Sequence, residues 1–171
     1  MKKQQSDLAT PLLKEARRVL VEDYPPRIAR CLKLLSEKEI WWRPNSASNS
    51  VGNLVLHLQG NVRQWIIAGL GGESELRDRD REFSETGPVP RRVLLAGLQK
   101  TVKEADQVLA SLKEPDLLRM FSIQGFDVTG VQVVCHVAEH FALHAGQIIF
   151  VTKLKCAKDL RFTRLPAQRK A

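Results

Sequence analysis

Apolar residues recur at three- and four-residue steps along four long stretches of the chain, a spacing that places them on one face of a helix. The first stretch runs from about residue 7 to 35. Pro25 and Pro26 interrupt it, so we expect a kink or a break near Tyr24. Residues 36–39 then have the spacing of a capping box and predict a short helix.

The second helix is expected to begin after Asn49 or Ser50, both good N-cap residues, and to end in the glycines of residues 69–72. Residues 73–90 follow as a run of charged side chains closed by prolines. This composition predicts a solvated, mobile loop. The third helix is expected over about Pro90–Leu112, where apolar residues again follow the helical period.

A longer crossover, residues 113–128, precedes the fourth helix, and Phe121–Phe126 within it alternates well enough to predict a short extended piece. Thr129–Gln132 has capping-box spacing and starts the fourth helix, which continues to about Leu154. Four helices joined by short and long connections predict an all-α protein, a four-helix bundle with a long crossover before the fourth helix. The order of the helices in the bundle is left open by these patterns.

The chain has four histidines, and their placement is the strongest chemical signal in it. His57 lies midway along the second helix, whereas His136, His140 and His144 follow one another along the fourth. A step of four residues drifts by only about 40° around a helix, so these three form one stripe. The fourth helix is apolar in most other directions, and we expect it to be buried nearly all round.

Buried imidazoles need partners for both ring nitrogens, and a metal ion would satisfy several of them at once. Two histidines four residues apart can share one ion, and His57 is the histidine left to supply a third ligand. His136 and His144 lie about 12 Å apart along the axis, too far to bind one ion together. Spacing therefore leaves two pairs open, His136 with His140 or His140 with His144. A histidine-lined cavity that holds water is the alternative.

Composition and charge add two expectations. The chain has 171 residues, 43% of them apolar and 27% charged, which fits one soluble domain, and its apolar runs are too short for a membrane span. Without a secretory signal or a CxxC pair among its three cysteines, we expect it in the cytoplasm. Residues 153–171 hold seven Lys or Arg residues and one acid. We interpret them as a solvated tail. Nucleic-acid binding is not expected, because Phe162 is the one aromatic there.

His140–Ile148, with two histidines four apart before Ala-Gly-Gln, resembles the fourth-helix signature of the DinB-like (DinB/YfiT) superfamily, where Arg-Gly-Gln follows the histidines. Trp41–Leu58 resembles its second-helix region, and Ile123–Phe126 suggests a branch of uncharacterised members, a domain of unknown function. The resemblance spans about residues 8–155. It predicts a DinB-like domain over residues 1–155 and a basic C-terminal tail over residues 156–171.

This resemblance implies an up-down-down-up bundle, frequent homodimers and a divalent metal, commonly zinc or nickel. The metal would be held by one second-helix histidine and the fourth-helix pair, which are His57, His140 and His144 here. His136 then lies one turn away, where it orients a ligand or lines the pocket. Ala145 stands where many relatives have arginine, so we do not expect the anion contact of that arginine.

Characterised relatives include transferases that use low-molecular-weight thiols such as bacillithiol or mycothiol. The resemblance therefore implies a metal-dependent thiol S-transferase or hydrolase, with a non-catalytic metal- or small-molecule-binding bundle as the alternative. No catalytic residue is assigned, although His136 and Glu139 are the nearest candidates for a general base and Glu139 should face away. Asn53 and Gln147 each lie one turn from a predicted ligand. They either orient substrate or water or form hydrogen bonds between helices.

Overall fold

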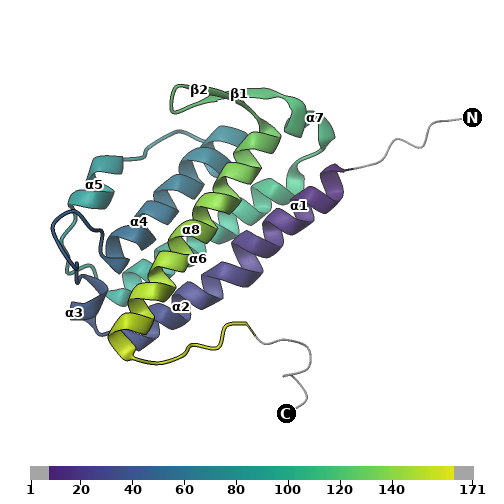
Figure 1. Cartoon of the computed structure of the whole chain (residues 1–171). Coiled ribbons are helices and arrows are strands. Elements are labelled where there is room, and N and C mark those ends of the chain that lie inside the picture. The colour runs from purple at the N-terminus through teal and green to yellow at the C-terminus, as the bar shows by residue number, and fades with distance from the viewer. Residues whose placement is uncertain (1–7, 164–171) are drawn as a thin grey trace, which may run out of the picture.

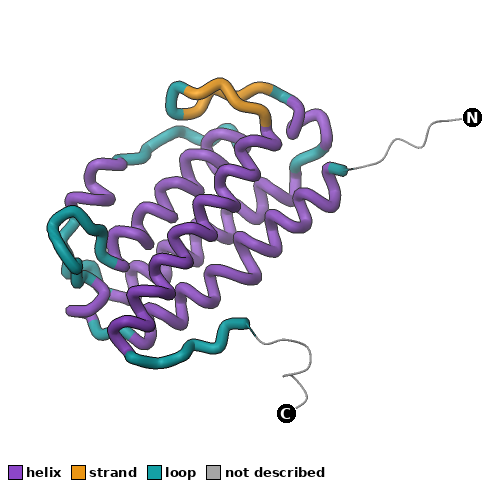
Figure 2. Tube along the Cα trace, in the orientation of Figure 1, coloured by secondary structure: helices purple, strands orange, loops and turns teal. Residues whose placement is uncertain are grey.

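The computed structural model describes residues 8–163, and most of its regular structure is helical (Figures 1 and 2). Four long helical segments lie side by side: α1 (Ala9–Arg17) continued by η1 (Arg18–Asp23) and α2 (Tyr24–Leu34); α4 (Val51–Val62) continued by η2 (Arg63–Leu70); α6 (Arg91–Ser111); and α8 (Gly130–Cys156). The connections hold α3 (Glu37–Ile40), α5 (Arg79–Ser84), α7 (Glu114–Leu118) and a hairpin of β1 (Met120–Ile123) and β2 (Phe126–Thr129). The predicted all-α class is confirmed.

The predicted interruption of the first helix takes the form of a π-helical segment. Proline lacks an N–H group, and its ring collides with the carbonyl four residues earlier, so an ordinary α-helix cannot continue through Pro25 and Pro26. The chain widens over η1 just before them, and the N–H of Tyr24 donates to the carbonyl of Val19, five residues back. Both prolines then occupy the first turn of α2, where their missing donors are tolerated.

The core lies where the four segments meet. α2 packs against α8 and α6, and α4 packs against the same two helices. Ile28, Leu58, Leu98 and Phe141 represent the four segments in this core, and all are buried. At about 25 cal/mol per Å² of apolar surface, each fully buried side chain of this size contributes about 1.5–3 kcal/mol.

The extended piece predicted before the fourth helix is an antiparallel hairpin with a two-residue turn. Gln124 and Gly125 form this turn, with φ values of 54° and 79°. Positive φ at both positions is typical of a type I′ turn, which matches the twist of a hairpin. Ile123 is buried against η2, so the hairpin covers the end of the second long segment.

The exposed apolar side chains of α8 contradict the expectation that this helix is buried nearly all round. Leu143, Phe150 and Leu154 are 60%, 68% and 59% exposed, so α8 is not buried all round. Within residues 8–163, α8 is the one helix long and apolar enough to cross a membrane by length and composition, a property that core helices of soluble proteins share. Its opposite face, which includes Phe141 and Ile148, is buried against the other segments.

The chain beyond α8 is described only as far as residue 163. Leu160 is buried, and the ring of Phe162 lies 5.9 Å from the guanidinium of Arg27 and 5.2 Å from that of Arg30. The first residues after α8 therefore return to α2. Residues 164–171, which carry part of the predicted basic tail, lie outside the described residues, and the domain boundary at 155 stays a prediction.

Ser50 and Asn53 form the capping box that begins α4, so the alternative cap Asn49 is not used. The Asn53 amide oxygen accepts from the N–H and hydroxyl of Ser50, at 3.1 and 2.6 Å. Its amide nitrogen donates to the carbonyls of Glu82 and Glu85, at 2.9 and 2.7 Å. One fully buried amide thus starts the helix and attaches residues 82–85 to it.

Replacing Asn53 with alanine leaves several buried donors and acceptors without partners. We expect Asn53→Ala to lower the free energy of unfolding by about 2–4 kcal/mol, measured by urea denaturation. Asn49→Ala is the matched control and should stay within about 0.5 kcal/mol of the wild type, because Asn49 is exposed. Equal effects of the two substitutions would contradict the assignment of the cap.

Candidate metal centre

Three histidines meet between α4 and α8. One nitrogen of each of His57, His140 and His144 lies within 4.8 Å of the other two, and the Nε2 atoms of His57 and His140 are 2.8 Å apart. His57 is buried, whereas His140 and His144 are partly exposed. The structure therefore brings together the three histidines that were predicted to bind a metal, from two helices far apart in the sequence.

His136 lies one helical turn from this cluster. Its ring stacks on that of His140 at 5.4 Å between centroids and packs against Trp65 at 4.2 Å. Its Nε2 atom is 3.4 Å from the amide nitrogen of Asn61. His136 is thus part of the wall beside the three histidines, and of the two pairs that spacing allowed, His140 and His144 are the ones that converge with His57.

A buried carboxylate supports His57 from the far side. Glu82 Oε2 lies 2.9 Å from Nδ1 of His57, and Glu82 is 8% exposed. Arg77 holds the same carboxylate with two hydrogen bonds, Nε to Oε1 at 2.7 Å and Nη2 to Oε2 at 2.8 Å. Its third nitrogen, Nη1, donates to Gln64 Oε1 at 2.8 Å. Gly60 lies directly beneath, where any Cβ would collide with Glu82.

The proton on His57 can be assigned from these contacts. An ionised carboxylate can only accept, so Nδ1 must carry the hydrogen and donate it to Glu82. Arg77 Nη2 also lies 3.0 Å from Nδ1 and could donate to it only if Nδ1 carried no hydrogen. In that case two lone-pair-bearing atoms, Nδ1 and Glu82 Oε2, would repel each other at 2.9 Å. The lone pair of His57 is therefore on Nε2, directed at the cluster, as in carboxylate–histidine–metal arrangements.

Gln147 fixes the position of the hydrogen on His144, as Glu82 does on His57. Its side-chain oxygen lies 2.7 Å from Nδ1 of His144, so that nitrogen donates and Nε2 keeps its lone pair. Gln147 follows His144 by three residues, which places both side chains on one face of α8. Gln147, which lies one turn from a predicted ligand in the sequence, contacts the imidazole of that residue.

The electrostatics of the site favour neutral imidazoles beside a charged carboxylate. Burial, assisted by the neighbouring histidines and Arg77, lowers the pKa of His140 to about 3. Burial also lowers the pKa values of His136 and His144. Burial opposes the charge of Glu82, but hydrogen bonds from Arg77 and His57 outweigh it and keep the pKa of that carboxyl below its usual value. At neutral pH, His136, His140 and His144 are therefore uncharged, and each has an unprotonated ring nitrogen that can bind an ion.

Three imidazole nitrogens suit a divalent ion of intermediate hardness, such as zinc. Metal–nitrogen bonds of about 2.0–2.1 Å place tetrahedral ligand atoms about 3.3 Å apart. The separations here, from 2.8 Å to below 4.8 Å, bracket that value. Imidazole nitrogens suit zinc, nickel and copper, whereas magnesium and calcium prefer oxygen. Three protein ligands leave a position for water or substrate.

The expectation of a solvated loop over residues 73–90 holds for most of the segment, which is exposed, but it is wrong for the part that holds the carboxylate. That segment contains α5 and supplies Glu82 and Arg77, whose side chains are 9% and 3% exposed. Both residues occur within a run of alternating charges, and nothing in the local pattern distinguishes them from their exposed neighbours. Asn53, predicted one turn from a ligand, makes no side-chain hydrogen bond to His57. It binds the backbone carbonyl of Glu82 and so positions the residue that does.

Comparison with solved structures shows the fold. A conserved protein from Enterococcus faecalis aligns with a TM-score of 0.68 and 19% identity, over 92% of this chain and 99% of that one. A DinB-like protein, YjoA, from Bacillus subtilis aligns with a TM-score of 0.65 and 16% identity, over 85% and 95%. A DinB-like protein from Bacillus cereus gives 0.60 and 16%, over 77% and 85%.

Comparison with curated proteins finds no match. Residues 7–169 match the family described as "Protein of unknown function (DUF1572)", which is nearly the whole chain. This match and the fold of the DinB-like structures agree with the resemblance carried by the second- and fourth-helix motifs. The chain therefore belongs to the DUF1572 family of proteins of unknown function and has a DinB-like fold.

Proposed function

We propose that this protein binds one divalent metal ion, zinc or nickel, through His57, His140 and His144. The observation that carries the proposal is the pair of contacts that fix which ring nitrogen of His57 and of His144 carries the hydrogen. Glu82 and Gln147 hold Nδ1 of His57 and His144, which leaves Nε2 of each ring without a proton and able to bind an ion. A cavity that merely enclosed water would not need a buried carboxylate and arginine to fix one imidazole.

We propose further that the site serves a thiol S-transferase or a hydrolase. A bound divalent ion lowers the pKa of a thiol or a water and so supplies a nucleophile at neutral pH. His57, packed against Phe83 at 4.7 Å between ring centroids, forms the buried side of the site. The partly exposed His140 and His144 form the side that a small substrate, such as a low-molecular-weight thiol, would approach. His136, kept neutral by burial, is the nearest group able to accept a proton.

A binding role without turnover is the second candidate. It is favoured because neither nearby carboxylate is placed to act as a general base. Glu82 is fully engaged by Arg77 and His57, and Glu139 is exposed on α8. Among residues 8–163, no other carboxylate makes a hydrogen bond to the three histidines. Catalysis at this site would therefore rely on His136 or on the substrate for proton transfer.

We propose that the four long segments run up-down-down-up in chain order. We also propose that the protein is soluble and cytoplasmic. Arg91 at the start of α6 donates to the carbonyl of Leu35 at the end of α2, at 2.9 Å, which supports an antiparallel course for α2 and α6. Arg63 at the end of α4 donates to Glu104 in the later part of α6, at 2.7 Å, which supports a parallel course for α4 and α6. α8 follows the long crossover and packs against α2. The fold of the DinB-like structures supports a soluble domain.

The first experiment is metal analysis of untagged protein with two matched variants. We expect about one equivalent of zinc, nickel or a similar ion in the wild type, measured by elemental analysis after dialysis. His140→Ala should lose it, because two ligands bind much more weakly than three. His136→Ala removes a histidine of the same stripe and should keep the ion. A wild-type protein that stays metal-free after reconstitution, or equal losses in both variants, would rule out the site.

The role of Glu82 gives a second prediction. Glu82→Gln keeps the size of the side chain but removes its charge, and we expect metal affinity to fall by about 10–100-fold in a competition titration. Glu139→Gln, one residue from His140 but exposed, should leave the affinity unchanged. Unchanged affinity in Glu82→Gln would show that the carboxylate does not support the ligand.

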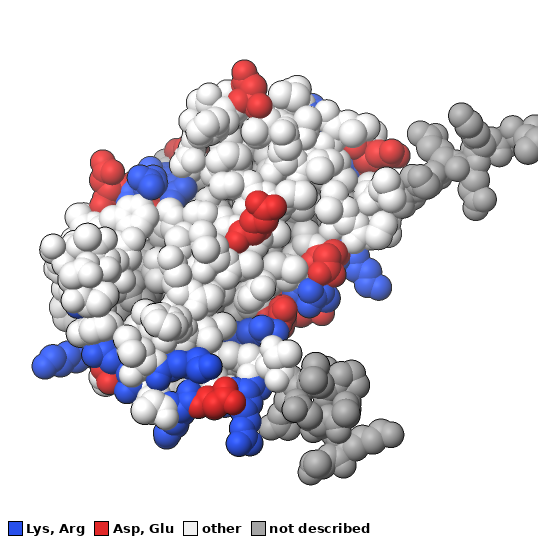
Figure 3. Space-filling model, viewed as in Figure 1, with Lys and Arg blue, Asp and Glu red and all other residues white. Residues whose placement is uncertain are grey.

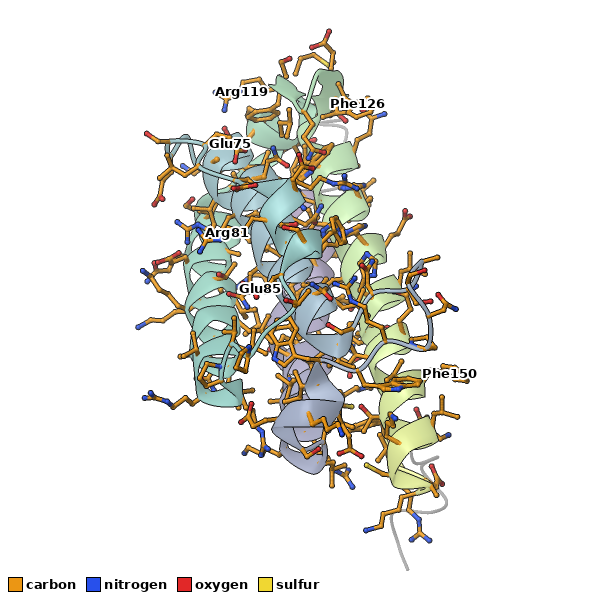
Figure 4. All side chains as sticks on the ribbon, turned by 90° about the vertical axis from the view of Figure 1, so that its left-hand side faces the viewer. Glu75, Arg81, Glu85, Arg119, Phe126 and Phe150 are labelled. Carbon is orange, nitrogen blue, oxygen red and sulfur yellow. The ribbon has the colours of Figure 1, made fainter. Side chains whose placement is uncertain are left out.

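We also propose a homodimer that covers the apolar side of α8. Figure 3 shows a broad face with few charged residues in the view where α8 lies in front, and Figure 4 shows Phe150 pointing away from the bundle. Phe150→Glu should convert a dimer into a monomer, measured by light scattering after gel filtration. Val93→Glu is the control, since Val93 is 49% exposed on α6, which lies on the other side of the molecule from α8 in Figure 4, and should not matter. A wild-type monomer at high concentration would contradict the proposal.

A further inference from the structure

A groove of about 600 Å³ runs between α2 and α6, and none of the four histidines lines it. Its α6 side extends from Leu95 to Asp106, eleven residues along, or about 16 Å at 1.5 Å per residue. Volumes of about 300–1,000 Å³ are typical of sites for single small molecules. The groove is therefore large enough to hold one elongated ligand.

Short side chains on α2 open this groove. Pro25, Pro26 and Ala29 face it there and leave space that longer side chains would fill. On the α6 side, Leu98 and Val102 form a floor that is 2% and 8% exposed. The interruption of the first long segment by prolines thus creates an apolar trough on its surface.

The rim of the groove carries uncompensated positive charge. Arg30, Lys33 and Lys103 line it and are exposed. Within residues 8–163, none of these three cations takes part in an ion pair. The single acid of the lining, Asp106, is already neutralised by two hydrogen bonds from Arg17, at 2.6 and 3.1 Å. An anionic group at this rim would find free cations and no opposing charge.

We propose that the groove binds an anionic amphiphile with one acyl chain, such as a fatty acid. The acyl chain lies on the floor formed by Leu98 and Val102, where burial of its methylene groups favours binding. The carboxylate meets the guanidinium of Arg30 and the ammonium of Lys33, which lie one turn apart on α2 at the end of the groove where α6 begins. An apolar trough alone would accept any hydrophobic partner, and the cationic rim is what selects an anion.

The test is binding of dodecanoate, measured by calorimetry below its micelle concentration, with dodecanol as the uncharged match. We expect dodecanoate to bind at least tenfold more tightly than dodecanol, with one site per chain. The double variant Arg30→Glu/Lys33→Glu should bind dodecanoate at least tenfold more weakly. Lys158→Glu, a charge reversal at an exposed lysine outside the groove, should bind it like the wild type.

A carboxylate could also reach a metal, so the experiment includes metal-free protein and His140→Ala. Both should bind dodecanoate with wild-type affinity, which separates this proposal from that of the metal centre. Equal affinity for dodecanoate and dodecanol, no effect of the double variant, or loss of binding in His140→Ala would overturn the proposal. A change of oligomeric state in the double variant, without a change in dodecanoate binding, would overturn it in favour of a second copy of the chain.

Discussion

The carboxylate of Glu82, held between Arg77 and His57, connects the charged segment 73–90 with the helix that carries the histidine. Burying an ionised carboxylate costs several kcal/mol unless its oxygens are paired and hydrogen-bonded. Here Arg77 occupies both oxygens and His57 shares one, while Asn53 holds the backbone of the same residue. These bonds make the burial tolerable and fix the direction of one imidazole.

The rest of the site follows from that constraint. With Nδ1 of His57 committed to Glu82, its Nε2 must face α8, where His140 and His144 stand one turn apart. Gly60 keeps the space beneath the carboxylate free, and the cap at Ser50 and Asn53 sets where α4 begins. Residues spread over more than eighty positions thus determine the placement of three nitrogen atoms.

Local rules made the main helices and their starting points predictable. Capping boxes at Ser36, Ser50 and Thr129 begin helices where they were expected, because they depend on neighbours three residues apart. The convergence of His57 with His140 and His144 required the family resemblance, since spacing alone allowed a different pair. Glu82 and Arg77 were missed because their role depends on contacts across the fold, and a charged segment carries no local sign that two of its side chains are buried.

The central claim is that these three histidines bind one ion in the orientation that Glu82 imposes. Crystals of the protein soaked with zinc, and measured at wavelengths on both sides of the zinc absorption edge, test it most directly. The account predicts a single anomalous peak per chain, about 2.0–2.1 Å from Nε2 of His57, His140 and His144. A peak bound by His136, a peak elsewhere on the chain, or none at full zinc saturation would contradict it.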